Sequence, residues 1–182
     1  MTERPIIFST PMILAILDGK KTMTRRVIKP QPAGHEFNGF NAFGEAIFYP
    51  RDDNSDDAGL RRCPFGQPGD KLWVRETWRT LTEGIEYRAD WVDPPRGIWK
   101  SPIFMPRLAS RITLEIAAIR VERIQDITEE DIRYAEGCLY TPWLPSGDPL
   151  VFQNVWDSLN AKRGYGWEKN PFVWVIEFRR LP

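Results

Sequence analysis

The segment from Arg111 to Ile124, RITLEIAAIRVERI, constrains the fold most, because residues that favour strands run along its whole length. A strand this long does not lie flat in a small sheet; it bends or contains a bulge, as the strands of barrels do. A second such run, FVWVIEFRRL, extends from Phe172 to Leu181 and suits a strand that closes a barrel. Shorter segments with strand character are residues 5–8, 22–28, 46–49, 71–77 and 84–90.

Three short helices are predicted from the residues that begin and end them. In the first, Thr10 is a good N-cap and Gly19 suits the position just past the end. The second, DITEEDIRYAEG, has Thr128 as its cap and Gly137 as its stop. The third, DPLVFQNVWDSLNAKRG, is capped by Asp148. Its apolar face is expected to pack in the core and comprises Phe152, Val155, Trp156 and Leu159.

The order of these segments favours an α+β fold, because strands and helices do not alternate regularly and no repeat is visible. We therefore expect a small mixed β-barrel with about three short flanking helices. A chain of 182 residues suffices for one core, so residues 1–182 are expected to form a single domain. Between about residues 29 and 68 the periodicity is lost, which predicts a long loop excursion with a small hairpin around residues 46–49.

Composition argues against several classes of function. The 25 basic and 25 acidic residues balance, so no global charge indicates a nucleic-acid or membrane partner. With no signal peptide and no apolar run of bilayer length, we expect a cytoplasmic protein. His35, Cys63 and Cys138 are too few and too scattered to suggest a zinc site or a disulfide framework. Glycine-rich phosphate motifs are also absent, so neither a cofactor nor a metal is predicted.

The basic residues are nevertheless distributed unevenly along the chain. The first 30 residues carry six cations against two acids: Arg4, Lys20, Lys21, Arg25, Arg26 and Lys29 against Glu3 and Asp18. Such an excess is the footprint of a face that binds a phosphate-bearing ligand, and the alternative is a solvated charged surface. The eight tryptophans are hard to explain by core filling alone, so some are expected to line a cavity.

The string GKKTMTRR, residues 19–26, is the main candidate for chemistry. Burial and neighbouring cations favour the neutral form of a lysine, and a neutral Lys21 could take a proton from the hydroxyl of Thr24. Thr24 and Arg26 share a strand face because they are two residues apart, so Arg26 could hold an anionic or carbonyl oxygen. The alternative is an ordinary charged turn between a helix and a strand.

The spacing Gly19-x-Lys21-x-x-Thr24-x-Arg26 after a short helix resembles the signature of ASCH domains, which are relatives of the PUA-like β-barrels that bind RNA and modified bases. Further matching segments follow in order along the chain. They are Gly69-Asp70 leading into KLWVRE, then ITLEIAAIRVERI, ITEEDIRYAEG and VWVIEF. As a whole, the sequence looks most like the longer ASCH proteins that phages and prophages encode.

The resemblance implies a set of site residues. In one bacterial branch, the small acetylcytidine amidohydrolases, a lysine, a threonine and a glutamate are taken as the catalytic group. By motif they correspond to Lys21, Thr24 and Glu136, with Glu129 or Glu130 as other positions for the glutamate. A carboxylate at the end of a helix opposes the helix dipole, and Glu136 would be tolerated there if it faced a pocket. Further candidates for ligand binding are Gly19, Lys20, Arg25, Arg26, Arg75, Trp73 and Trp78.

The function that we expect is binding of RNA or a modified nucleoside in a basic cleft, with hydrolysis of an amide such as that of acetylated cytidine. One alternative is a non-catalytic module in which the basic turn holds phosphate and Trp73, Trp78 or Trp99 stacks on a base. Another is a ribonuclease that uses the same lysine and threonine.

Overall fold

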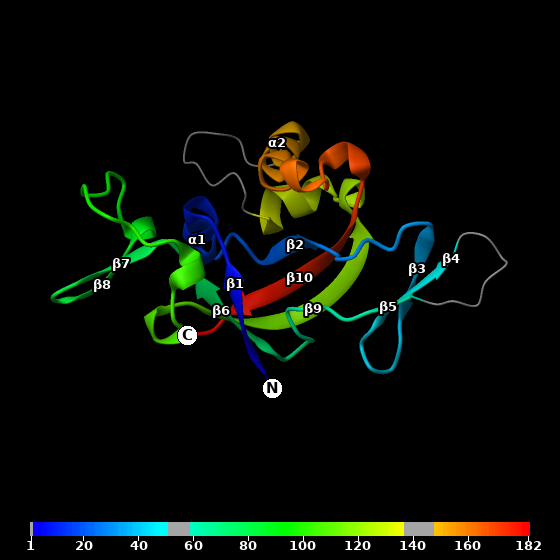
Figure 1. Ribbon diagram of the computed structural model, residues 1–182, viewed down its shortest axis with the longest axis horizontal. Helices are drawn as coiled ribbons and strands as arrows, with labels where there is room; N and C mark the ends of the chain where they lie inside the picture. Colours follow the sequence, from blue (N-terminus) through cyan, green and yellow to red (C-terminus); the bar gives the residue numbers. More distant parts are fainter. Residues whose placement is uncertain (1, 51–58, 137–147) are drawn as a thin grey trace.

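The computed structural model describes residues 2–50, 59–136 and 148–182 (Figure 1). Two positions singled out in the sequence, Gly137 and Cys138, lie outside these ranges. The described residues form a central five-stranded sheet in which only the β1–β6 pair is parallel. Its strands, in spatial order, are β1 (Glu3–Ile7), β6 (Lys71–Arg75), β9 (Thr113–Arg123), β10 (Phe172–Arg180) and β2 (Met23–Val27).

Two smaller β elements and several helices surround this sheet (Figure 1). One is a three-stranded sheet of β3 (His35–Phe40), β4 (Ala46–Pro50) and β5 (Gly59–Arg61), and the other is the hairpin of β7 (Trp78–Leu81) and β8 (Gly84–Tyr87). The longer helical elements are α1 (Thr10–Leu17), the π-helical η5 (Asp131–Ala135) and α2 (Pro149–Asn160). Short 3-10 turns are η1 (Arg88–Asp90), η2 (Pro102–Phe104), η3 (Arg107–Ala109), η4 (Ile124–Asp126), η6 (Ala161–Arg163) and η7 (Trp167–Lys169).

The predicted mixed α+β architecture is confirmed, but the predicted closed barrel is not. In the described part of the chain, β1 and β2 are the two edges of the central sheet and do not pair with each other. A side chain crosses between them instead: Nη2 of Arg26 in β2 donates to the carbonyl oxygen of Ile7 in β1 at 2.7 Å. The sheet therefore stays open at one place.

The two faces of the sheet pack against different cores. The larger core lies on the side of α1 and includes Ile13 and Ile16 of that helix together with Trp174 of β10. The smaller core lies under α2 and η5 and includes Val173 and Val175 of β10. Strand β10 is therefore buried on both faces, which explains its nearly continuous apolar sequence.

The long strand β9 bends as predicted, and it does so at a bulge. Ile116 and Ala118 face consecutive residues of β10, Phe178 and Glu177, so Ala117 is the extra residue. Figure 1 shows β9 as a curved ribbon beneath β10. A bulge of this kind increases the local bend and twist of the strand that contains it.

The bulge also changes which side chains of β9 face which core. Before it, Ile116 packs in the larger core, and after it the odd-numbered Val121 does so. Because side chains alternate along a strand, Arg120 and Glu122 point to the opposite face, where the β2 residue Arg25 also lies.

The predicted helix caps are largely found. The hydroxyl of Thr128 accepts from the backbone nitrogen of Asp131 at 3.1 Å, and the carboxylate of Asp148 accepts from that of Leu150 at 2.8 Å. The first helix begins one residue earlier than expected, so Ser9 rather than Thr10 is its N-cap. Within the described ranges, every helix is too short or too polar to traverse a lipid bilayer.

The expected loop excursion at 29–68 needs a correction, because three strands lie within it, β3 to β5. The expected hairpin near 46–49 is β4 paired with β3. Phe48 of β4 packs edge-on against Phe172 of β10, with ring centroids 5.3 Å apart. The strand character of this segment depends on such contacts with distant residues, which the short, glycine-interrupted sequence pattern did not reveal.

Candidate functional site

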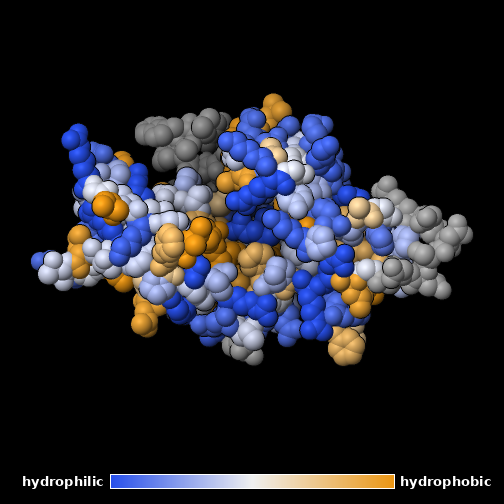
Figure 2. Space-filling model, viewed as in Figure 1, coloured by the Kyte–Doolittle hydropathy of each residue, from blue (hydrophilic) through white to orange (hydrophobic). Residues whose placement is uncertain are grey.

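A cleft of about 740 Å³ opens where the central sheet stays open, between the edges β1 and β2, and α2 forms its opposite wall. In Figure 2 apolar and hydrophilic surfaces meet in a hollow near the centre of this face. We call it the β1–β2 cleft. Its lining residues include Ile7, Phe8, Thr24, Arg25, Arg26, Arg61, Phe65, Glu136, Phe152, Trp156 and Arg163.

The lining of the cleft is strongly positive, although the whole chain has no net charge. Among the described residues around it, the carboxylate is that of Glu136, whereas the cations are Arg25, Arg26, Lys29, Arg61, Arg62 and Arg163. The aromatic residues Phe8, Phe65, Phe152, Trp156 and Trp174 supply much of the apolar wall. A cavity that combines several cations with apolar surface suits a ligand that is anionic at one end and flat and apolar at the other.

Glu136, in the floor of the cleft, is held by two cations. Nζ of Lys21 donates to Oε2 at 2.9 Å and also to the backbone oxygen of Glu136, while Nη1 of Arg25 donates to Oε1 at 2.7 Å. The side chains of Lys21, Arg25 and Glu136 are 0%, 1% and 4% exposed. Lys21 lies behind Glu136 rather than in bulk solvent.

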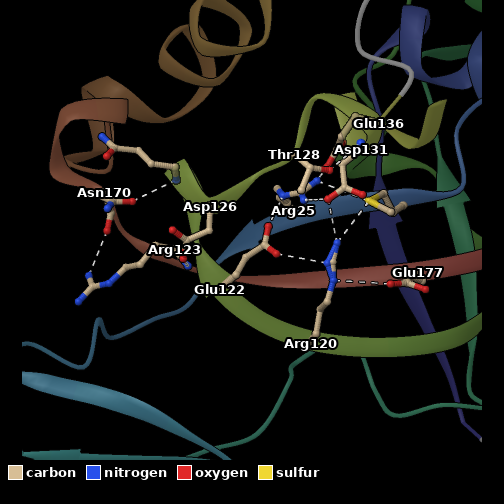
Figure 3. A network of polar contacts seen from close by, with 12 residues as sticks. Arg25, Arg120, Glu122, Arg123, Asp126, Thr128, Asp131, Glu136, Asn170 and Glu177 are labelled. Atoms are coloured by element: carbon tan, nitrogen blue, oxygen red, sulfur yellow. Dashed lines mark hydrogen bonds and ion pairs between the residues drawn. The ribbon is translucent and has the colours of Figure 1, made fainter. Parts of the chain in front are cut away.

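Arg25 is saturated by further carboxylates on the same face of the sheet (Figure 3). Its Nε donates to Glu122 at 2.6 Å, and its Nη2 donates to Asp131 at 2.5 Å. Arg120 bridges the same two carboxylates, at 3.2 Å from Glu122 and 3.0 Å from Asp131. Three elements, β2, β9 and η5, thus converge on one guanidinium, and this convergence fixes where Glu136 sits.

Glu136 is ionised in this arrangement. Burial by itself would raise the pKa of the Glu136 carboxyl, but the charges and hydrogen bonds of Lys21 and Arg25 outweigh burial and hold the pKa below its usual value. The prediction that a carboxylate at this helix end faces a pocket agrees with the position of Glu136 in the cleft lining.

Arg26, the next residue along β2, has a different environment. Its guanidinium lies 5.1 Å from the centroid of the Phe8 ring and donates to the backbone oxygen of Ile7. Within the described ranges no carboxylate lies within ion-pair distance of it, and burial lowers its pKa to about 10. Arg26 therefore presents a poorly compensated positive charge in the cleft.

Thr24 shares the face of Arg26, as its spacing predicts. It is only 2% exposed and lines the cleft together with Glu136. Lys21 and Glu136 are in direct contact, and Thr24 lines the same cleft as Glu136, although the three motif residues come from a turn, a strand and a helix end.

The other candidates from the sequence lie elsewhere. Gly19 adopts a φ of +71° in the turn after α1, where glycine is favoured, and Lys20 is exposed, 3.9 Å from Asp18. The indole of Trp73 packs against the guanidinium of Arg75, and Trp78 is buried in a small cluster with Met105. The described lining of the cleft includes none of Gly19, Lys20, Trp73, Arg75 and Trp78, so their role in binding stays a prediction.

Sequence reasoning also missed residues that line the cleft. The apolar face of α2 was expected to be core: Phe152 and Trp156 do pack in the smaller core, and they also form the cleft wall with Leu159. Arg61 and Arg163 carried no signal beyond their charge. In residues 2–50, 59–136 and 148–182, no group of three or more histidine, cysteine or acidic side chains is placed to hold a metal ion.

Comparison with known proteins gives one solved structure to report. No family model matches the chain, and no curated protein matches it either. The chain is similar to a crystal structure described as an ASCH domain from Lactobacillus crispatus JV V101, with a TM-score of 0.49 and 11% sequence identity. The similarity covers 98% of this chain and 79% of the other. A likeness of this strength carries no argument about activity, so the proposals below depend on the geometry of the cleft.

Proposed function

We propose that the β1–β2 cleft binds a nucleotide or modified nucleoside, free or within RNA. One observation carries this proposal: of the six cations in the described lining, Arg25 and Arg62 are paired with carboxylates, whereas four have no ion pair among the described residues, in a chain of zero net charge. These four are Arg26, Lys29, Arg61 and Arg163. Arginine recognises phosphate well, because the guanidinium donates several hydrogen bonds in a plane.

Particular groups suit the two parts of such a ligand. Arg26 offers a charge without a carboxylate partner among the described residues, and Nε of Arg61 is buried without a hydrogen-bond partner in the same set. Under this proposal both donate hydrogen bonds to phosphate oxygens. The partly buried Phe65 and the wall of α2 provide apolar surface for a base.

Binding is tested by calorimetry with cytidine 5′-monophosphate, cytidine and N4-acetylcytidine at several salt concentrations. Arg26→Gln is expected to weaken binding of the monophosphate about tenfold or more, because a hydrogen bond to a charged group is lost. The matched control is Arg179→Gln, which changes an arginine outside the cleft lining whose side chain is 70% exposed. Absence of binding by the wild type, or equal losses in the two variants, would refute the proposal.

A second candidate function, hydrolysis of an amide on the bound nucleoside, is favoured by the contact between Lys21 and Glu136 beside Thr24. Lys21 already donates to Glu136, so in this geometry we take the ionised Glu136, rather than Lys21, as the acceptor for the Thr24 proton. The Thr24 oxygen would then attack the amide carbonyl, and Arg26 would stabilise the negative oxygen.

The remaining steps balance without a further reagent besides water. When the C–N bond breaks, the leaving amine takes the proton from Glu136 and departs, and the acyl group stays on Thr24 as an ester. Water then attacks the ester, Glu136 accepts one of its protons, and Thr24 regains a hydrogen as the carboxylic acid leaves.

This activity is tested by following conversion of N4-acetylcytidine to cytidine by liquid chromatography. Thr24→Val and Lys21→Ala are expected to abolish turnover, whereas Thr24→Ser keeps a hydroxyl and retains part of it. Wild-type protein that binds the substrate without converting it would refute this second function and leave the first intact. Incubation with an RNA oligonucleotide tests the ribonuclease alternative, which predicts shortened products.

A further inference from the structure

A second, smaller pocket of about 250 Å³ lies beside the β1–β2 cleft. We call it the Tyr165 pocket. Among the described residues, those that line it come from the segment after β2, the end of β9 and the segment between η6 and β10: Gln31, Pro32, Ala33, Gly34, Arg123, Gly164, Tyr165, Lys169 and Pro171.

The two pockets share a rim. Lys29 lines the cleft and lies two residues before Gln31, which lines the Tyr165 pocket. Arg163 lines the cleft and is followed directly by Gly164 and Tyr165. Nζ of Lys29 lies 5.1 Å from the centroid of the Tyr165 ring, so side chains of the two rims are in contact. The two pockets therefore adjoin at Lys29 and Arg163.

The Tyr165 pocket repeats the chemistry of the cleft on a smaller scale. It contains an aromatic ring, partly exposed, and the cations Arg123 and Lys169, with no carboxylate in its described lining. Arg123, which Figure 3 shows at the end of β9, has two contacts that hold it in place. Its guanidinium carbon lies 3.6 Å from the centroid of the Phe172 ring, and its Nη1 donates to the backbone oxygen of Asn170. Lys169 is exposed and can turn toward a ligand.

We infer that the Tyr165 pocket is a subsite for the nucleotide next to the one in the cleft, so that the natural ligand is a nucleic-acid strand rather than a free nucleoside. The inference rests on the proposed function. Lys29 lies over one face of the Tyr165 ring. The neighbouring base would stack on the opposite face, and Lys29 and Arg163 on the shared rim would pair with the connecting phosphate. Single strands are commonly held in this way, by cations along the backbone and aromatic rings between them.

The experiment compares binding of cytidine 5′-monophosphate with binding of the ribotrinucleotide CCC and its deoxy counterpart, each over a range of salt concentrations. We expect the ribotrinucleotide to bind about tenfold more tightly than the monophosphate, with a steeper salt dependence because more phosphates are contacted. The deoxy form separates RNA from DNA as the source of the strand.

Variants separate the subsite from the cleft. Tyr165→Ala is expected to remove most of the trinucleotide advantage and leave monophosphate affinity unchanged, whereas Tyr165→Phe retains the ring and the advantage. Lys169→Gln is expected to lower the trinucleotide affinity and its salt dependence. Lys162→Gln is the matched control, since Lys162 is an exposed lysine nearby that lines neither pocket.

Two results would overturn the inference while leaving the proposed function standing. One is equal affinity of the wild type for the monophosphate and both trinucleotides. The other is a loss of monophosphate binding in Tyr165→Ala as large as the loss of trinucleotide binding. If neither the monophosphate nor a trinucleotide binds, the proposed function itself fails, and the inference fails with it.

Discussion

Arg25 and Arg26 are adjacent in sequence and belong to one strand, yet their surroundings are opposite. Arg25 lies under η5 and contacts Glu122, Asp131 and Glu136 at 2.5–2.7 Å. Arg26 lies on the other face, with Phe8 and a backbone carbonyl as its contacts. Burial lowers the pKa of both guanidinium groups, but the carboxylates around Arg25 outweigh burial and leave its pKa raised, whereas that of Arg26 falls to about 10.

The difference separates two uses of positive charge. The charge of Arg25 is neutralised by ion pairs within the protein, and one of these pairs fixes the carboxylate of Glu136. Arg26 has no carboxylate within ion-pair distance among the described residues, and under the proposed function its charge serves a ligand; a partly buried cation of this kind lowers stability. Sites of binding and catalysis commonly keep such uncompensated groups.

The largest effect is expected from exchanging each arginine for methionine. Arg25→Met leaves three carboxylates without their central partner and is expected to lower the free energy of unfolding by about 3–5 kcal/mol. Arg26→Met removes a poorly compensated charge and is expected to leave stability unchanged or higher. Urea denaturation measures both, and comparable losses in the two variants would contradict the comparison.

A smaller effect is expected from acid. The folded-state pKa of Glu136 lies below its ordinary value of 4.5, so the unfolded chain binds more protons in the range just below pH 4.5. The contribution of Glu136 to stability is therefore complete above that pH and is lost as the pH falls through the folded-state pKa. In Glu136→Gln the loss of stability between pH 5 and pH 3 should be shallower than in the wild type.

Other carboxylates also contribute to the pH dependence of the wild-type unfolding free energy. Asp70, for example, has a lowered pKa because the backbone nitrogens of Thr2 and Gln67 donate to its carboxylate. The difference between the wild type and Glu136→Gln isolates Glu136. Urea denaturation at each pH gives the unfolding free energy. If it declines equally with falling pH in the wild type and in Glu136→Gln, Lys21 and Arg25 do not lower the pKa of Glu136.

The smallest effect is expected at Lys20. Its side chain is 58% exposed and 3.9 Å from Asp18, so Lys20→Ala should change the unfolding free energy by less than about 0.5 kcal/mol. Lys21→Ala, one residue later, leaves the buried Glu136 with one cation fewer and should cost several times more. Equal denaturation midpoints for the two variants would contradict the structural difference between these neighbours.

The parts of the molecule that local sequence determines could be predicted. Capping by Thr128 and Asp148 depends on residues two or three positions away, and the shared face of Thr24 and Arg26 follows from strand periodicity. The meeting of Lys21 with Glu136 came from the resemblance of motifs rather than from any local rule.

The remainder depends on contacts between distant segments. Strand periodicity cannot tell whether two edge strands meet, so it did not separate a closed barrel from the open sheet whose gap holds the cleft. Likewise, the apolar face of α2 indicates burial, but Phe152 and Trp156 serve a core and a cleft wall at once. The strands β3 and β5 are short and mostly polar, so their pairing was not visible.

The extra residue at Ala117 shapes β9 without deciding which face its charges occupy. Deleting Ala117 would leave Ile116 opposite Phe178 and Ala118 opposite Glu177, so side chains would alternate without interruption along the strand. Arg120 and Glu122 would stay on the face of Arg25, and Val121 would stay in the larger core. The deletion would remove the added bend and twist, so a transplant of this site into a flatter sheet would keep the residues and lose the curvature that brings them under η5.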